Sequence, residues 1–325
     1  MKLLRRQFLH LAAGAAALPA VSRFAWAEAY PTRPVHIIVG FAAGQAIDIL
    51  VRLVGQWLSE RLGQPFVVEN RPGAGGNIAT EVVVRSPADG YTLLAVGSNN
   101  YINASLYERL NFNFIRDIAP VASISRTPNV MEVNPSVPVK TVPEFIAYAK
   151  ANPGKLSMAS AGNGSTAHLA GESFKMMTGV NMLHVPYRGS PLALTDLLSG
   201  QVHVMFDNLP SSIEHIRAGK LRALGVTTAA RSELLPDVPT VGDFVPGYEA
   251  SAAPGIGVPK NTPTEIVDKL NKEINAGLAN PRIRARFADL GVMVVAGSPA
   301  DFGKLIADET EKWGKVIRAG NIKAE

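Results

Sequence analysis

Two short glycine-containing loops carry the residues best suited to bind a small molecule. One is VGFAAGQAID, residues 39–48, and the other is ASAGNGSTAHL, residues 159–169. Each loop follows a run typical of a buried strand and precedes a run typical of a helix. Because the first N–H groups of a helix lack intrahelical acceptors and its dipole is positive at that end, both loops favour an anionic ligand.

The first loop contains a glycine and an acid that need separate interpretation. Gly44 permits close approach of the backbone to a ligand because it has no side chain. Asp48 is expected in the first turn of the following helix, where a negative charge suits the helix dipole. Two interpretations stay open: Asp48 caps unpaired amides, or it positions a water or accepts a donor from the ligand.

The second loop has the same plan. Gly162, Asn163 and Gly164 form a compact turn that gathers N–H donors, Ser165 is expected to cap the helix, and His168 falls in its first turn. An ordinary strand-to-helix turn is the alternative for either loop alone. The presence of one such loop in each half of the chain favours a shared ligand site.

Most catalytic and cofactor signatures are absent from the sequence. It contains no GxxxxGK[ST], GxSxG or HExxH motif, and in RPGAGGN (residues 71–77) Ile78 follows where a dinucleotide fingerprint requires glycine. Three histidines lie among strand residues, where we expect structural roles, and a fourth is expected on a helix surface: His36, His184, His203 and His215. We therefore expect no cofactor, no metal and no catalytic residue.

The N-terminus predicts export. Arg5 and Arg6 precede an apolar stretch over residues 8–21, and Ala25-Trp26-Ala27 resembles a cleavage site. We interpret residues 1–27 as a twin-arginine export signal cleaved near Ala27, which places the mature protein in the periplasm. A membrane anchor is the alternative, but the stretch is short for a bilayer and Pro19 interrupts it.

Charge and composition narrow the function classes further. The chain has 32 Lys+Arg and 27 Asp+Glu, but Lys2, Arg5, Arg6 and Arg23 lie in the predicted signal, which leaves 28 against 27. This balance gives no support for a nucleic-acid or anionic-membrane surface. The absence of cysteine excludes disulfides and thiolate chemistry. No second long apolar run follows, so we expect no membrane-embedded segment, and we expect a monomer.

Strand and helix patterns alternate through most of the chain. Strands are expected at residues 36–39, 66–68, 92–96, 156–160, 182–186, 202–207 and 221–227, with a helix over residues 47–62. From residue 265 onward the patterns are helical, with one short apolar piece at 292–295. Continuous apolar strands joined by helices predict parallel sheets covered on both faces.

This order of elements predicts two α/β domains. The terminal helices have no sheet of their own and must pack on one already built. We expect domain 1 to comprise residues 28–126 and 250–325, and domain 2 to comprise residues 127–249. Two extended crossings, near residues 122–133 and 248–258, would join the lobes, and such an interface favours a hinge and a ligand site.

Several sequence blocks together resemble a known family. They are YPTRPVHIIVGFAAG, PFVVENRPGAGGNIATE, ADGYTLL, ANPGKLSMASAGNGSTAHLAGE, HVPYRGSPLALTDLLSGQV and LPDVPTV. The chain is similar over residues 30–322 to the periplasmic solute-binding receptors of tripartite tricarboxylate transporters, the Bug or TctC type. The resemblance implies a two-lobed, type II-like periplasmic-binding-protein fold that closes on a small carboxylate.

The resemblance also implies a set of ligand-binding residues. From the first loop they are Phe41, Gly44, Gln45 and Asp48, and from the second Ala161, Gly162, Asn163, Ser165 and His168. For the far end of the ligand they are Ser98, Asn99, Arg188 and Asp207. The first loop departs from the family pattern because Gln45 stands where a glycine is usual, so we expect Gln45 to help select the ligand.

The function implied is that of a non-enzymatic receptor. It would capture a di- or tricarboxylate, or an aromatic or amino-acid carboxylate, and present it to membrane permease subunits. A first alternative keeps the fold and makes the protein the ligand-sensing partner of a membrane signalling kinase. A second is an exported enzyme that uses Asp48 and His168 as an acid/base pair.

Overall fold

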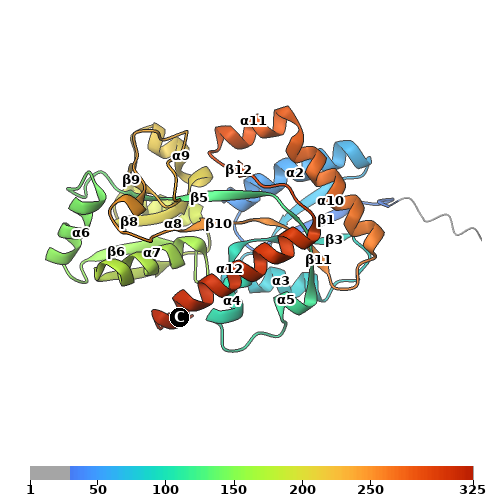
Figure 1. Cartoon of the computed structure of the whole chain (residues 1–325), viewed down its shortest axis with the longest axis horizontal. Coiled ribbons are helices and arrows are strands. Elements are labelled where there is room, and N and C mark those ends of the chain that lie inside the picture. The colour runs from blue at the N-terminus through green and yellow to red at the C-terminus, as the bar shows by residue number, and fades with distance from the viewer. Residues whose placement is uncertain (1–29, 325) are drawn as a thin grey trace, which may run out of the picture.

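The structure is a computed structural model that describes residues 30–324, and the predicted export signal, residues 1–27, lies outside them. The described chain forms two sheets, each flanked by helices, that lie side by side as two lobes (Figure 1). The strand order is β2-β1-β3-β11-β4 in the first sheet and β10-β5-β8-β6-β7 in the second, where β9 and β12 also pair with β5. The predicted two-lobed α/β fold is confirmed.

Strands appear at each place where the sequence predicts one, with bounds that shift by at most two residues. The first sheet contains β1 (Val35–Val39), β2 (Phe66–Asn70), β3 (Thr92–Val96), β4 (Ile118–Ser123) and β11 (Gly255–Pro259). The second contains β5 (Ser125–Val133), β6 (Leu156–Ser160), β7 (Met182–Pro186), β8 (Val204–Asn208), β9 (Arg222–Val226), β10 (Ser251–Ala252) and β12 (Met293–Val294).

Helices cover both sheets. The first half of the chain contributes α2 (Ala46–Leu62), α3 (Asn77–Val84), α4 (Ser98–Leu106), α5 (Phe114–Asp117), α6 (Val142–Ala151) and the short 3-10 turn η1 (Ala74–Gly76). The second half contributes α7 (Thr166–Thr178), α8 (Ser190–Ser199), α9 (Leu209–Arg217), α10 (Thr264–Ala279), α11 (Pro281–Asp289), α12 (Pro299–Ala319) and the 3-10 turn η2 (Val241–Asp243).

Helix α2 shows how the apolar pattern positions the first loop. Leu50, Val51, Val54 and Leu58 recur at helical spacing and are buried against the first sheet. The helix ends at Gly63, which adopts a left-handed conformation with φ of 72°. With one face and its end fixed in this way, the start of α2 is held directly after β1.

The parallel pairing that the sequence predicts is found within each lobe, but both sheets are mixed. Strand β1 pairs in parallel with β2 and β3, and β6 pairs in parallel with β7 and β8. Strand β11 is antiparallel to β3 and β4, and β5 is antiparallel to β8 and β9. The reversal arises because β5 and β11 enter their sheets from the opposite lobe rather than through a covering helix.

The chain passes between the lobes twice, where the sequence predicts the crossings. Strand β4 of the first sheet continues through Ile124 into β5 of the second, and β10 continues through Ala253 and Pro254 into β11. The two crossings pair with each other, with Ser251 opposite Pro128 and Ala252 opposite Thr127. We propose that the domain boundaries lie within this two-stranded connection.

Helix α12 lies across the crossing and anchors it (Figure 1). Arg126 of β5 forms an ion pair with Glu309 of α12, with 2.6 Å between Nη1 and Oε1. Glu309 also accepts a hydrogen bond from Nε1 of Trp313, which is buried. Because the Glu309 side chain is only 5% exposed, its charge depends on Arg126 for compensation.

Replacing Arg126 with methionine tests this anchor. We expect Arg126→Met to lower the free energy of unfolding by about 3 kcal/mol, because it leaves a buried carboxylate unpaired. Urea denaturation at neutral pH measures the change. The matched control is Arg33→Met, which breaks a pair with Asp89 in which both side chains are over 40% exposed and which should cost about 1 kcal/mol or less. Equal losses in the two variants would contradict the assignment.

Candidate functional site

A small cavity lies between the lobes, and the N-termini of four helices meet at it. Its walls come from the starts of α2, α4 and α7 and from Asn208, which precedes α9. The volume is about 30 Å³. The lining residues are Phe41, Gln45, Ala46, Ile47, Leu50, Gly97, Ser98, Asn99, Thr127, Ser165, Thr166, Asn208, Ala252 and Pro254. We call this space the inter-lobe cavity.

The backbone amides at these helix starts are available to a ligand. Ser98, Asn99 and Thr166 are the first residues of α4 and α7, where helical N–H groups have no acceptor within their own helix. Helices of 17, 9, 13 and 9 residues direct the positive ends of their dipoles at this space. Of the described residues that line the inter-lobe cavity, none carries a charge. Helix ends and amides are therefore what stabilises an anion there.

The remaining walls are of two kinds. Phe41, Ile47, Leu50, Ala252 and Pro254 form an apolar part, and the side chains of Thr127, Asn208 and Gln45 form a polar part. Asn208 donates hydrogen bonds from Nδ2 to Asn129 Oδ1 at 2.9 Å and to Thr166 Oγ1 at 3.2 Å, which holds it in place. The combination suits an organic anion with an apolar body.

A second, larger cavity of about 450 Å³ adjoins the first through Phe41, which lines both. Both glycine loops contribute to its walls, and so does the loop before α3. Its lining residues are Gly40, Phe41, Pro72, Gly73, Ala74, Gly75, Gly76, Ile78, Tyr107, Ala161, Gly162, Asn163, Pro186, Tyr187 and Arg188. The two loops therefore face common cavities, as a shared ligand site requires.

The structure brings most of the sequence-predicted residues to these walls. Those that line the inter-lobe cavity are Phe41, Gln45, Ser98, Asn99 and Ser165. Those that line the larger cavity are Phe41, Ala161, Gly162, Asn163 and Arg188. Four others line neither cavity: Gly44 is exposed, and Asp48, His168 and Asp207 are buried behind the walls.

Asp48 supports the first loop from behind. Its carboxylate accepts hydrogen bonds from Gly44 N at 2.9 Å, Arg52 Nε at 3.0 Å and Asn70 Nδ2 at 2.8 Å. Burial alone would raise the pKa of Asp48, but these hydrogen bonds and the Arg52 charge lower it below its usual value. Of the two interpretations that the sequence left open, this geometry supports the capping role.

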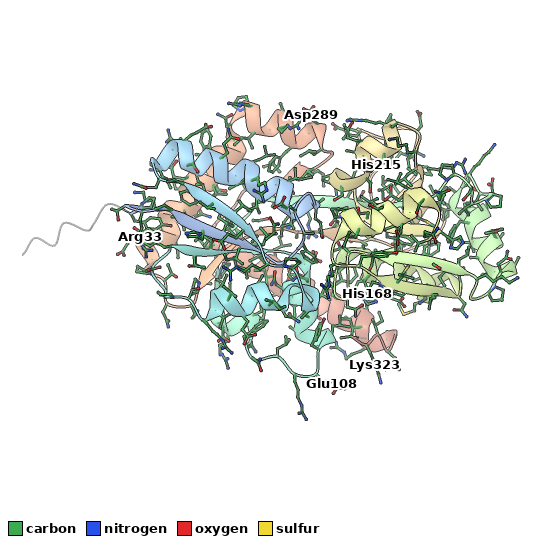
Figure 2. The ribbon with its side chains drawn as sticks, turned by 180° about the vertical axis from the view of Figure 1, so that it is seen from behind. Arg33, Glu108, His168, His215, Asp289 and Lys323 are labelled. Atoms are coloured by element: carbon green, nitrogen blue, oxygen red, sulfur yellow. The ribbon has the colours of Figure 1, made fainter. Side chains whose placement is uncertain are left out.

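His168 is a neutral buried group in the second lobe, near the junction with the first (Figure 2). Its ring stacks on that of His184 at 4.1 Å, and its Nδ1 accepts a hydrogen bond from Gly164 N at 3.3 Å. Burial, followed by the charges of His184 and Lys175, lowers the pKa of His168 to about 3. An imidazole that is neutral and away from both cavities does not form an acid/base pair with Asp48.

The other predicted structural histidines have partners in their sheets. His184 Nε2 is 2.7 Å from Ser160 Oγ, and His203 Nδ1 accepts a hydrogen bond from Ser157 N at 3.0 Å. His36 Nδ1 lies 2.5 Å from Glu69 Oε1. His215 is half-buried in the last turn of α9. In the described residues no group of three His, Cys, Asp or Glu side chains is arranged to hold a metal ion.

Asp207 lies behind the second lobe's wall, beside an acid that sequence reasoning missed. Its Oδ1 accepts a hydrogen bond from Ser190 Oγ at 2.6 Å, so it positions the start of α8 instead of facing a cavity. Ser212 Oγ is 3.2 Å from Asp207 Oδ2 and 2.6 Å from Glu132 Oε1. A hydroxyl has one hydrogen to donate, so one of these two contacts needs a hydrogen on a carboxyl group.

Glu132 is the better candidate for that proton. It is fully buried and its Oε2 has no hydrogen-bond partner among the described residues, which penalises the charged form. Burial and then the charge of Asp207 raise the pKa of Glu132 well above its usual value, and burial raises the pKa of Asp207 to about 6. Nothing in the alternating pattern of β5 distinguishes Glu132 from an exposed strand residue.

Sequence reasoning also missed one wall of the site and one of its helices. The loop before α3 was weighed only as a nucleotide fingerprint, yet Gly73, Gly75 and Gly76 have positive φ and form one wall of the larger cavity. Ser98 and Asn99 are predicted site residues, but the helix that they begin, α4, is not predicted. Ser and Asn are weak helix formers, and the buried hydrogen bond from Asn100 Nδ2 to Thr80 Oγ1 at 2.7 Å stabilises this helix instead.

Comparison with known proteins finds one family for nearly the whole chain. Residues 50–322 match the model of the tripartite tricarboxylate transporter family receptor. Protein BugT of Bordetella pertussis is 37% identical over 91% of this chain and 92% of its own. In the described residues no helix is both long and apolar enough to span a bilayer.

Solved structures of high similarity also match. R. palustris Rpa4515 with adipate is 40% identical, with a TM-score of 0.89 over 90% of this chain and 99% of that chain. MatC (Rpa3494) from Rhodopseudomonas palustris with bound malate is 31% identical, with a TM-score of 0.85 over 89% of this chain and 100% of that chain.

The buried acid pair predicts a pH dependence. A carboxyl whose pKa is raised on folding binds more protons in the folded state, so its contribution to stability falls as pH rises above its usual value of 4.5. We expect Glu132→Gln to flatten this decline, which is at most about 1.4 kcal/mol per pH unit. Urea denaturation at several values between pH 5 and 8 gives the slopes.

The control is Glu214→Gln, because the Glu214 side chain is 78% exposed. This variant should keep the slope of the original protein. A Glu132→Gln slope that equals the original would show that Glu132 is charged throughout this range.

Proposed function

Because this chain belongs to the tripartite tricarboxylate transporter receptor family, we propose that it captures a small organic carboxylate between its lobes in the periplasm. It would then deliver that ligand to the membrane permease subunits of a tripartite transporter. The predicted export signal supports the location. The adipate and malate of two similar structures support the ligand class, because both are small carboxylates.

The observation that carries this proposal is the meeting of four helix N-termini at a cavity without charged side chains. Amide donors at the starts of α4 and α7 would hold the carboxylate through charge-assisted hydrogen bonds. The hydroxyl of Thr127 would complete its coordination. The Asn208 side chain lies beside it as an uncharged wall, because its Nδ2 donates to Asn129 and Thr166. The low polarity of a closed cleft strengthens each of these bonds.

The rest of the ligand would contact the other walls. Phe41, Ile47 and Leu50 offer an apolar surface for a carbon chain. Arg188 is exposed and lines the larger cavity, where it would pair with a second carboxylate on a longer acid. Asp207 has no such role, because its carboxyl binds Ser190 and Ser212.

Ligand entry requires the lobes to separate. The inter-lobe cavity has a volume of about 30 Å³. This is enough for one buried water, but it is smaller than a dicarboxylate such as adipate. Both lobes and the crossings contribute walls, so a rotation about the crossings widens the inter-lobe cavity. The closed arrangement described here is the state that we propose for the complex, with one carboxylate in the inter-lobe cavity and the rest of a longer acid in the larger cavity that adjoins it.

Isothermal titration calorimetry with a panel of mono-, di- and tricarboxylates tests the ligand class. We expect Asn208→Asp to weaken binding of the best acid on the order of 100-fold, because it adds a negative charge to the cavity wall. Thr127→Val removes one donor with little change of shape and should weaken binding about 10-fold.

The exposed Asn181→Asp is the matched control for added charge. It should bind as the original protein does. Thermal unfolding of each variant separates lost binding from lost folding. The proposal fails if no acid on the panel binds, or if Asn208→Asp folds normally and binds as tightly as the control. Mass spectrometry of the acid after incubation should recover it unchanged, as a receptor requires.

Closure is tested by a pair of glycine variants. Gly164 and Gly179 have φ of 76° and 70°, so alanine strains both backbones alike. A Cβ on Gly164 would overlap Asn103 Oδ1 in the first lobe, whereas a Cβ on Gly179 meets no atom within 4 Å. We expect Gly164→Ala to weaken carboxylate binding about 10-fold. Gly179→Ala should lose a similar amount of stability but keep its affinity, and equal affinities would argue against closure at Gly164.

A further inference from the structure

Gln45 joins the two lobes directly. It is the residue before the first turn of α2, but its side chain forms no capping hydrogen bond to that helix. Instead, its Oε1 accepts a hydrogen bond at 3.3 Å from the backbone N–H of Ser190, the first residue of α8 in the second lobe. The Gln45 side chain therefore contacts the second lobe instead of capping α2.

A second hydrogen bond lies beside the first. The N–H of Ala46, at the start of α2, donates to Oγ of Ser211 at 3.0 Å, and Ser211 belongs to α9 of the second lobe. Two successive residues of the first lobe are therefore bonded to two different helices of the second. Neither bond involves an ion pair, so salt screens them little.

The partner side of this contact is fixed. Ser190 is fully buried, and its Oγ donates to Asp207, which in turn lies against Ser212. Gly189 has φ of 125°, and a Cβ there would lie 2.9 Å from Ala42 Cβ and 3.2 Å from Gln45 Oε1. The two lobes thus approach at a point where only a glycine fits, and the Ser190 amide is presented in one orientation.

We propose that Gln45 is a latch, which means that it stabilises the closed arrangement of the lobes even without ligand. The proposal extends the function given above, since it concerns the opening and closing that we assign to a carboxylate receptor. Gln45 is 4% exposed, so the bond that it forms is protected from water. The loss of one such bond shifts an equilibrium about 2- to 10-fold.

The latch predicts effects that differ from those of a simple ligand contact. Without ligand, the protein should populate the closed arrangement, and removal of the bond should lower that population. With ligand bound, opening must break the same bond, so its removal should accelerate dissociation about 2- to 10-fold. The ranking of different carboxylates should change less than their dissociation rates, because the Oε1 atom is occupied by Ser190.

Pairs of spin labels measure the lobe separation directly. The chain has no cysteine, so cysteines introduced at Glu214 and Asp289 accept labels specifically. Both positions have exposed side chains, 78% and 65%, and they lie on α9 and α11 in different lobes. Figure 2 shows Asp289 and His215 on the same edge of the molecule, and His215 follows Glu214 in the chain.

The labelled protein is compared with its Gln45→Gly, Ser211→Ala and Gln201→Gly variants by double electron–electron resonance, first without ligand and then with adipate. Glycine is well tolerated before a helix, so Gln45→Gly should fold. We expect the first two variants to lose closed population without ligand. Gln201→Gly, which removes an exposed loop glutamine, should not change it.

A ligand-free distance distribution in Gln45→Gly that equals the original would overturn the latch. If the order of carboxylate affinities changed in the same variant, Gln45 would be a direct ligand contact instead. A labelled original protein that no carboxylate binds would contradict the receptor function instead, and the ligand-free comparison would still decide the latch.

Discussion

The function that we propose for this protein depends on one electrostatic constraint, which is that an anion taken out of water needs hydrogen-bond donors or positive charge around it. The chain would meet this constraint with helix starts instead of charged side chains. Four N-termini reach the inter-lobe cavity from two sheets, and the lining residues that the structure describes include no cation. Such a cavity requires helices that begin directly after strands. The N-termini of these helices must also face each other across the two lobes.

The groups behind the walls have structural tasks that follow from this constraint. Asp48 holds the first loop by binding Gly44, and Asp207 holds the start of α8 through Ser190. His168 and His184 fill the space beneath the second loop as neutral rings. Aspartate and histidine suggest catalysis when they are seen in a sequence. In this structure, these residues hold the backbone of the loops and helix starts in place. In the proposed site, ligand binding is therefore left to peptide N–H groups and to uncharged polar side chains.

The sequence predicted the fold well because the fold depends on local patterns. Apolar runs and helix-ending glycines located β1 to β3 and β6 to β9, and the order of the elements predicted the two lobes. The sequence also predicted the two loops of the site, but it did not predict which of their side chains line the cavities. Asp48 and Asp207 look equally suited to bind in a sequence, and only packing shows that both are consumed by neighbours. Glu132 and the start of α4 escaped notice because their partners are more than fifteen residues away in the chain.

Because the described lining of the inter-lobe cavity is uncharged, the charge of its walls should not depend on pH. Peptide N–H groups neither gain nor lose protons over the range in which proteins fold, so these walls have the same electrical character in acidic and alkaline surroundings. If the proposed function holds, the ionisation of the ligand governs binding. The cavity would bind the ionised carboxylate, so a more acidic medium would lower the concentration of that form and leave the cavity walls unchanged.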